Sequence, residues 1–243
     1  MTPIAPPRAL PLGWVLLIGL AVLGGLELFA RHGYHAPGEL PRRAAAARAS
    51  FRDDAIDVVL YGSCLGEQAL DHRLIGERLG ARGVVHSLAA AATDTMDWFL
   101  AQQDLLVPGN LDATVVLYMT GDLVRGPSLW RSQALDLARW SNIRELASWS
   151  CSTGDCVAEF YLRRASFFYR YRAYFGNFVW WQAGARAPQK AGTPPEGMRP
   201  DGVRADGEAA ALHFLERLVR MTVAAEVPII FIRMPEKAGG HHQ

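Results

Sequence analysis

The sequence predicts an α/β fold, with a parallel β-sheet between two layers of helices (a three-layer arrangement), preceded by one transmembrane helix. One observation is an apolar run at residues 10–30, LPLGWVLLIGLAVLGGLELFA, whose length matches the roughly 20 residues that a helix needs to cross a bilayer. A second is a set of short, β-branched apolar runs beyond residue 54. A third is the helical periodicity between these runs, because alternating strands and helices are typical of a parallel sheet.

The apolar run is bounded by residues that suit a bilayer. After a short tail, residues 1–9, Trp14 lies near the beginning of the run, where interfacial aromatic residues belong. Glu27 lies near its end, where a carboxylate reaches the headgroups. The apolar region of a cleaved signal peptide is shorter, about 7–15 residues, so the run is interpreted as an uncleaved anchor. Membrane lipid is therefore an expected partner.

Basic residues predict the orientation of the chain in the membrane. Arg8 precedes the apolar run. Four arginines follow it: Arg31, Arg42, Arg43 and Arg48. This count alone places the rest of the chain on the cytoplasmic side. Residues 31–53, rich in Ala, Arg and Pro, are interpreted as a juxtamembrane stalk. The formal net charge of the 243 residues is +1, so no basic excess indicates a nucleic-acid partner.

Residues 54–243 are predicted to form the α/β domain. Its predicted strands are Val58–Tyr61, Gly83–Leu88, Ala113–Met119 and Val227–Met234. Its predicted helices are Glu67–Leu79, a helix that begins after Asp94 as N-cap, and Glu208–Glu226. The chain stops soon after the last strand, with no helical pattern behind it. A C-terminally truncated chain is one explanation of that ending.

An aromatic helical insertion is predicted at about residues 127–182. Its densest part is Phe160–Trp181, FYLRRASFFYRYRAYFGNFVWW. This part is either a helix packed over the sheet with its arginines reaching water, or an amphipathic surface that lies on the membrane or lines an acyl-chain groove. Aromatic residues occupy all faces of the helix, which favours the first interpretation. A Pro/Gly-rich linker follows at about residues 183–207.

Two cysteines, Cys151 and Cys156, lie in the loop sequence WSCSTGDCVAEF. In an oxidising compartment they can form a disulfide, which would stabilise the fold by roughly 2 kcal/mol in the chain-entropy model. Two free thiols are the alternative, and the sequence leaves both open. Their spacing is not a zinc pattern, so the sequence predicts no metal and no cofactor.

The candidate site is where the first strand runs through Gly62 and Ser63 into Cys64 and a helix. Carboxyl ends of parallel strands meet at one edge of a sheet, and such an edge often carries the chemistry. The second strand brings His86 to this region, followed by Ala89–Ala92. The third strand is followed by Thr120 and Asp122.

These blocks, GSCL, HSLAAAATDT and YMTGDL, resemble in order and spacing the SGNH (GDSL-like) hydrolase superfamily over residues 54–234. They are similar to its membrane-anchored cell-envelope members, such as the D-alanine transfer and alginate acetylation proteins. The resemblance implies a flavodoxin-like sheet and a domain outside the cytoplasm. It also implies ester hydrolysis or O-acyl transfer on cell-envelope carbohydrate.

The resemblance assigns roles to individual residues. Cys64 stands at the position of the family's nucleophilic serine, with Ser63 before it. Ala91 lies in the stretch that should hold an oxyanion-hole glycine, and Thr120 is a substitute for the absent oxyanion asparagine. Asp122 could orient a base. The family's Asp-x-x-His is missing, which leaves three weak candidates for the base: His86, His241 and His242.

Two functions remain open from the sequence. One is an enzyme with an altered site, in which the Cys64 thiolate attacks an ester. The other is a pseudoenzyme, either a non-catalytic binding or assembly paralogue or the truncated product of such an enzyme. Under both interpretations the expected partners are envelope polysaccharide or an acyl-donor membrane protein. A redox or metal protein is less favoured, because the three cysteines lack CxxC spacing.

Overall fold

The structure is a computed structural model that describes residues 12–33, 39–51, 56–80, 83–90, 93–105, 113–119, 132–170 and 207–233. The chain forms two compact units. The N-terminal unit comprises residues 1–36 and 162–191, and the α/β unit comprises residues 37–161 and 192–243. The predicted aromatic insertion is therefore divided between the two units after residue 161.

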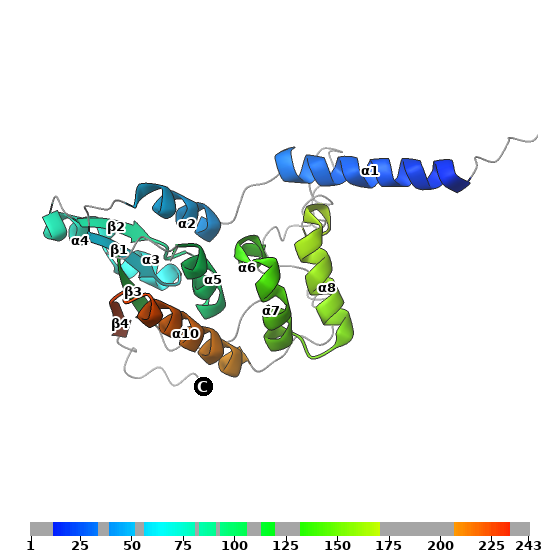
Figure 1. Ribbon diagram of the computed structural model, residues 1–243. Helices are drawn as coiled ribbons and strands as arrows, with labels where there is room; N and C mark the ends of the chain where they lie inside the picture. The colour runs from blue at the N-terminus through cyan, green and yellow to red at the C-terminus, as the bar shows by residue number, and fades with distance from the viewer. Residues whose placement is uncertain are drawn as a thin grey trace, which may run out of the picture. The chain divides into compact units, whose positions relative to one another are not determined.

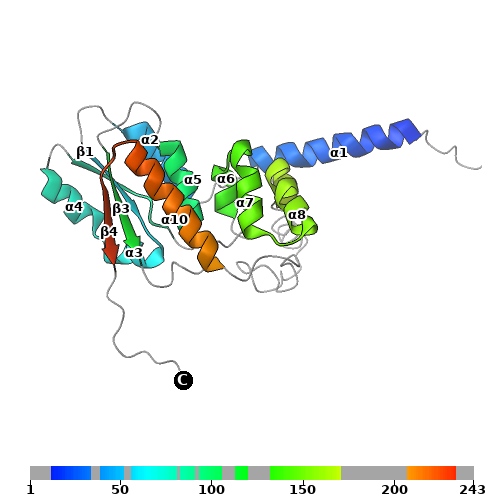
Figure 2. The same cartoon turned by 60° about the horizontal axis from the view of Figure 1, so that its bottom comes forward.

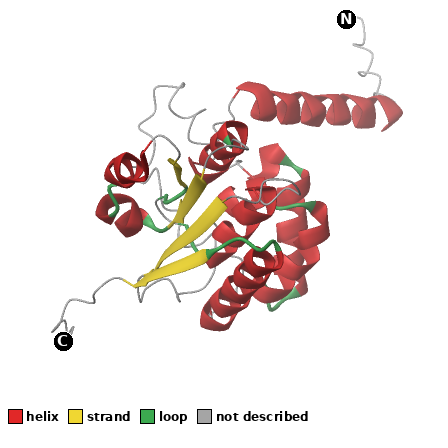
Figure 3. Cartoon of the chain, turned by 60° about the vertical axis from the view of Figure 1, so that its left-hand side comes forward, coloured by secondary structure: helices red, strands yellow, loops and turns green. Residues whose placement is uncertain are grey.

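The described residues of the α/β unit form a four-stranded sheet (Figure 1). Its strands are β1 (Ile56–Tyr61), β2 (Gly83–Ser87), β3 (Ala113–Met119) and β4 (Ile229–Arg233). Their spatial order is β2-β1-β3-β4, and each neighbouring pair is parallel. The four predicted strands and the α/β class are confirmed, and most of the described residues are helical (Figure 3).

One face of the sheet packs into the main hydrophobic core through Val59, Tyr61, Val115 and Leu117. The helices on this face are α2 (Glu39–Ser50), α5 (Thr95–Leu105) and α10 (Gly207–Ala224). Figure 2 shows them together on one side of the strands, with α4 (His72–Leu79) on the other side. On α4's side, Ile75 packs against Val58, Leu60 and Val116.

The helix predicted over Glu67–Leu79 is in fact two helices. α3 (Cys64–Ala69) begins earlier than predicted, and α4 begins at His72. Asp71 separates them, because its carboxylate accepts a 3.0 Å hydrogen bond from the backbone N–H of Leu74 and so caps α4. This hydrogen bond holds the pKa of Asp71 below its usual range.

α2 lies in the stretch that the sequence assigned to a stalk. Leu40, Ala44 and Ala47 on one side of α2 are at most 3% exposed and belong to the main core. Their spacing of four and then three residues is that of one helical face. The compact α/β unit therefore begins at residue 37 rather than at residue 54.

The region predicted as an insertion also contributes to the main core. It contains α6 (Ser132–Leu137), a 3-10 helix (Trp140–Asn142), α7 (Ile143–Ser150) and α8 (Gly154–Ala165). Leu135, Ile143, Leu146 and Phe160 are at most 3% exposed within that core. Cys151 and Cys156, between α7 and the first turns of α8, form a disulfide. Of the two interpretations of this pair, the structure has the bonded one.

α1 (Leu12–Gly33) belongs to the N-terminal unit. Among the described helices, it is the one long and apolar enough to cross a membrane, over Gly13–His32 with a mean hydropathy of 2.0. A signal sequence near an N-terminus meets the same criterion. The predicted apolar span is thus confirmed in length and composition.

Candidate functional site

The candidate site lies at the carboxyl edge of the sheet, where β1 ends. From β1, the chain continues to β2 on one side and reaches β3 on the other, so β1 and β3 flank a topological switch point. In open α/β sheets, ligands bind beyond the carboxyl ends of the strands at such a point. Gly62 and Ser63 connect β1 to α3, and Cys64 is the first residue of α3.

Hydrogen bonds join this turn to the loop that follows β2. The carbonyl oxygen of Gly62 accepts from the backbone N–H of Ala90 at 3.2 Å and from the hydroxyl of Thr93 at 3.0 Å. The indole N–H of Trp98 in turn donates to the Thr93 hydroxyl oxygen at 3.1 Å. Thr93 and Trp98 are buried, so these hydrogen bonds hold the backbone immediately before Cys64 in place.

Arg43 of α2 also binds residues at this edge of the sheet. Its guanidinium donates to the carboxylates of Glu39 and of Glu67 in α3, and to the carbonyl oxygen of Ala89 after β2. Burial disfavours the charged guanidinium, but the hydrogen bonds and charges of Glu67 and Glu39 outweigh it and raise the pKa of Arg43. Arg43 therefore links α2, α3 and the loop after β2 at the switch point.

Asp94 acts as the predicted N-cap of α5. One oxygen of its carboxylate accepts from the backbone N–H groups of Met96 at 2.9 Å and Asp97 at 3.2 Å. The Asp97 carboxylate accepts in return from the backbone N–H of Asp94 at 3.2 Å. This reciprocal arrangement is a capping box, which fixes the direction in which the chain leaves the site.

The remaining predicted site residues have different outcomes. Ser63 precedes α3 as its N-cap residue, half-buried and without a side-chain capping bond. Five further candidates lie outside the described residues: Ala91, Thr120, Asp122, His241 and His242. Their proximity to Cys64 remains a prediction.

His86 is turned toward β1 rather than toward the loops at the edge. Its Nε2 lies 2.6 Å from Oδ1 of Asp57, near the amino end of β1, and both side chains are 5% exposed. The ring of Phe51 packs edge-on against the imidazole at 4.9 Å between centroids. His86 and Asp57 thus form a buried polar pair in the core, which supports the packed interpretation of His86 over its role as a base.

Ser50, at the end of α2, extends this pair into a Ser–His–Asp row. Its hydroxyl oxygen lies 3.4 Å from Nδ1 of His86, at the outer limit of a hydrogen bond. The same hydroxyl donates to the carbonyl oxygens of Ala46 and Ala47, both at 3.0 Å. The carboxyl end of a helix also disfavours an oxyanion, so the row is better explained as structural than as catalytic.

Sequence reasoning did not identify Arg43 or Asp57 as partners of the candidate residues. For Asp57, the available signal was a carboxylate at the start of an otherwise apolar strand. Among the described residues, no group of three or more His, Cys, Asp or Glu side chains is placed to hold a metal ion.

Comparison of the chain with protein-family models finds no match, and neither curated proteins nor solved structures provide one. The residues and their geometry therefore carry the functional argument.

Proposed function

We propose that the chain is a membrane-anchored, SGNH-like α/β protein that hydrolyses or transfers acyl esters of cell-envelope carbohydrate, with Cys64 as its nucleophile. The observation that carries this proposal is the position of Cys64. It begins α3 directly beyond the carboxyl end of β1, at the switch point between β1 and β3. A nucleophile on a strand-to-helix turn at this edge is the arrangement that esterases of α/β folds use.

The chemical step needs a thiolate and an ester. The sulfur of Cys64 attacks the carbonyl carbon, a C–S bond forms, and the C–O bond to the leaving alcohol breaks. The leaving alkoxide takes a proton from solvent. Water or a sugar hydroxyl then attacks the carbonyl carbon of the thioester and loses a proton to solvent, the C–S bond breaks, and the thiolate returns while an acid or a new ester is released. The three-layer SGNH arrangement, Ala91 and Thr120 at the oxyanion and Asp122 as the orienting carboxylate are parts of this proposal.

The disulfide supports a location outside the cytoplasm. Disulfides persist in oxidising compartments and are rare in the cytosol. A bonded Cys151–Cys156 pair therefore favours an extracytoplasmic α/β unit, against the count of arginines around the apolar run. We take α1 in that orientation to be a retained anchor and envelope carbohydrate to be the substrate.

A non-catalytic binding or assembly module is the second candidate. The observation in its favour is that polar residues of the strands and helices around the site are already bonded to one another. His86 is paired with Asp57, and Arg43 is bound to Glu67 in the first turns of α3. A scaffold retained for binding needs such internal contacts but needs no general base.

Acylation of the full-length chain in detergent micelles distinguishes the two candidates. The protein is exposed to p-nitrophenyl acetate without reductant, and its intact mass is followed with time. Because Cys151 and Cys156 are bonded, Cys64 is the free thiol among the three cysteines. An active site predicts one acetyl adduct that forms, requires Cys64 and then decays.

Two variants complete the design. Cys64→Ala should abolish the adduct, whereas Ser63→Ala should leave it in place. A small free thiol at the same pH gives the rate of an unactivated reaction. A Cys64 adduct that forms no faster than on this free thiol, or that never decays, contradicts the enzyme and favours the binding module.

A further inference from the structure

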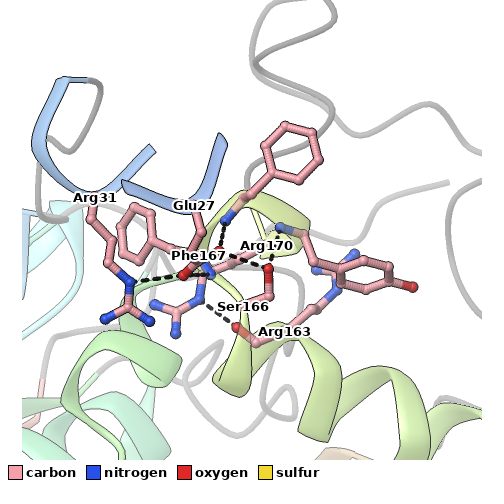
Figure 4. Close-up of polar contacts among 8 residues, drawn as sticks. Glu27, Arg31, Arg163, Ser166, Phe167 and Arg170 are labelled. Atoms are coloured by element: carbon pink, nitrogen blue, oxygen red, sulfur yellow. Dashed lines mark hydrogen bonds and ion pairs between the residues drawn. The ribbon is translucent and has the colours of Figure 1, made fainter. Parts of the chain in front are cut away.

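Glu27 of α1 binds a segment distant in the sequence (Figure 4). Its Oε1 accepts from the backbone N–H of Phe167 at 2.8 Å and from Nε of Arg31 at 2.7 Å. Its Oε2 accepts from the hydroxyl of Ser166 at 2.8 Å and from the backbone N–H of Phe168 at 2.9 Å. One carboxylate thus has four donors, and three of them lie about 140 residues away along the chain.

These donors lie at the start of a helical segment whose first turn, residues 167–170, is described, and the first N–H groups of a helix have no partner within that turn. Glu27 caps it from another element, while the Ser166 hydroxyl oxygen accepts from the backbone N–H of Tyr169 at 3.0 Å. The contact also has an apolar side. Ala30 of α1 is fully buried against Phe167 and Phe168. The turn is therefore fixed to one face of α1 by polar and apolar contacts together.

The position of Glu27 along α1 sets the depth of this contact. The apolar span ends at His32, five residues after Glu27. At about 1.5 Å per residue, Glu27 lies roughly 7–8 Å inside that end. Amphipathic elements that lie in a membrane interface are buried by about 5–10 Å, at the boundary between headgroups and acyl chains. Ser166 and Phe167 must lie at the depth of the carboxylate to which they donate.

We propose that residues 162–170 form a second membrane contact, held beside α1 at the headgroup level of a phospholipid bilayer. The inference rests on α1 as a retained anchor, which is part of the proposed function. It goes beyond that function because it assigns lipid as the partner of a segment that is not in the span. It also changes the balance between the two interpretations of the aromatic segment, since a helix merely packed over the sheet would not need Glu27.

The side chains of this segment suit a phospholipid interface. Leu162 is 50% exposed, and Phe167 and Phe168 are partly exposed, so apolar surface remains beyond the contact with Ala30. Arg163 and Arg164 lie in the last turn of α8, and long basic side chains can reach phosphate groups while their stems stay in the apolar layer. Aromatic and basic residues in this combination are typical of interfacial helices.

Depth-dependent fluorescence quenching tests the proposal on the full-length protein in phospholipid vesicles. In a Cys64→Ala background, the disulfide leaves no other thiol, so a fluorophore reacts only with an introduced cysteine. Labels are placed in the segment by L162C and F168C and in α1 by L20C. A fourth label is placed on α4 by R73C, because the Arg73 side chain is 72% exposed. Quenchers are lipids that carry a nitroxide near the headgroup or deep in the acyl chain.

The expected result is shallow quenching at residues 162 and 168, deep quenching at residue 20 and none at residue 73. If residue 20 is quenched and residues 162 and 168 behave like residue 73, the proposal is overturned while the anchor stands. If residue 20 is not quenched either, the retained anchor fails, and with it this proposal and the membrane-anchored part of the proposed function. The role of Cys64 is then still decided by the acylation experiment. Because L162C removes no side chain from the contact with Ala30, it remains informative should F168C misfold.

A second variant tests the role of Glu27. Glu27→Gln keeps one acceptor oxygen and replaces the other with an N–H₂ group, so two of the four donors lose their partner. Shallow quenching at residue 162 should fall toward the level of residue 73, with residue 20 unchanged. Glu216→Gln, at an exposed site of α10, is the matched control and should have no effect. Quenching at residue 162 that survives Glu27→Gln overturns the assignment of Glu27 as the residue that holds the segment.

Discussion

At the scale of single residues, His86 and Asp57 form a buried polar pair between two neighbouring strands of the sheet. It joins β1 to β2 within the core, where an unpaired polar group costs about 1–3 kcal/mol. The two residues are 29 positions apart in the sequence. The register of the parallel strands brings them together, so their contact could not be predicted from the sequence.

A double-mutant cycle measures this pair. Asp57→Ala and His86→Ala should each destabilise the full-length protein, and the double variant should cost less than their sum by about 1–3 kcal/mol, because each single change leaves a buried partner unpaired. Urea unfolding in detergent gives the free energies. The exposed pair of Arg73 and Glu77 is the control, with an expected coupling of at most about 0.5 kcal/mol. Additive costs at Asp57 and His86 would show that the pair is not coupled.

Tyr61 makes the stability of the protein fall at alkaline pH. Burial of its phenol, with a smaller effect of the Asp104 charge, raises the pKa of Tyr61 well above its ordinary value near 10. The folded state thus favours the neutral phenol, which donates to Oε1 of Gln102 at 2.5 Å. This contribution to stability is complete below about pH 10, the unfolded pKa, and is lost as the pH rises above it.

Tyr61→Phe therefore has two expected effects. At neutral pH it lowers the free energy of unfolding by about 1–3 kcal/mol, because the buried Gln102 loses its donor. Above about pH 10 the variant loses stability less steeply than the original protein. Urea unfolding from neutral pH to about pH 11 checks both, with Tyr161→Phe, at a 38% exposed side chain, as control. An unchanged slope above pH 10 would contradict the assignment to Tyr61.

At the scale of elements, Arg43 makes α2 a support of the candidate site. Arg43→Met keeps the length of the side chain but removes the donors to Glu67, Glu39 and Ala89. We expect this variant to lower the free energy of unfolding by about 1–3 kcal/mol and to speed amide hydrogen exchange in α3. Arg43→Lys should recover only part of the lost stability, because an ammonium group cannot reproduce the planar set of donors of a guanidinium. Arg42→Met, at the exposed neighbouring residue, is the control. It should change the free energy of unfolding by at most about 0.5 kcal/mol and leave the amide hydrogen exchange of α3 unchanged.

The elements also show what could be predicted from this sequence. The four strands were predictable because each is a compact β-branched run between polar turns, and the turn from β1 to Cys64 followed from the first of them. The break at Asp71 was missed because the apolar residues on both sides of it keep the spacing of one continuous helical face, although Asp is a common N-cap residue. The burial of α2 was missed because alanines dominate its core face, and their composition alone looks like a solvated stalk.

At the scale of the whole molecule, the boundary of the α/β unit follows from α2. A chain that begins at residue 37 keeps Leu40, Ala44 and Ala47 in the core. A chain that begins at residue 52 loses all three, and removal of one buried leucine costs about 2–5 kcal/mol. The first should unfold cooperatively on heating, as followed by near-UV circular dichroism, whereas the second should lack a sharp transition. Equal transitions in both would show that α2 is dispensable.

The strand order also has a consequence for how the chain is synthesised. β3 lies between β1 and β4, yet β4 begins 110 residues after β3 ends. At about 5–20 residues per second, β3 waits on the order of 5–20 seconds for its second neighbour. During that interval the sequence ATVVLYM presents an unpaired, β-branched edge of the kind that pairs with other chains. We therefore expect β3 to be exposed to pairing with other chains during the interval before β4 emerges.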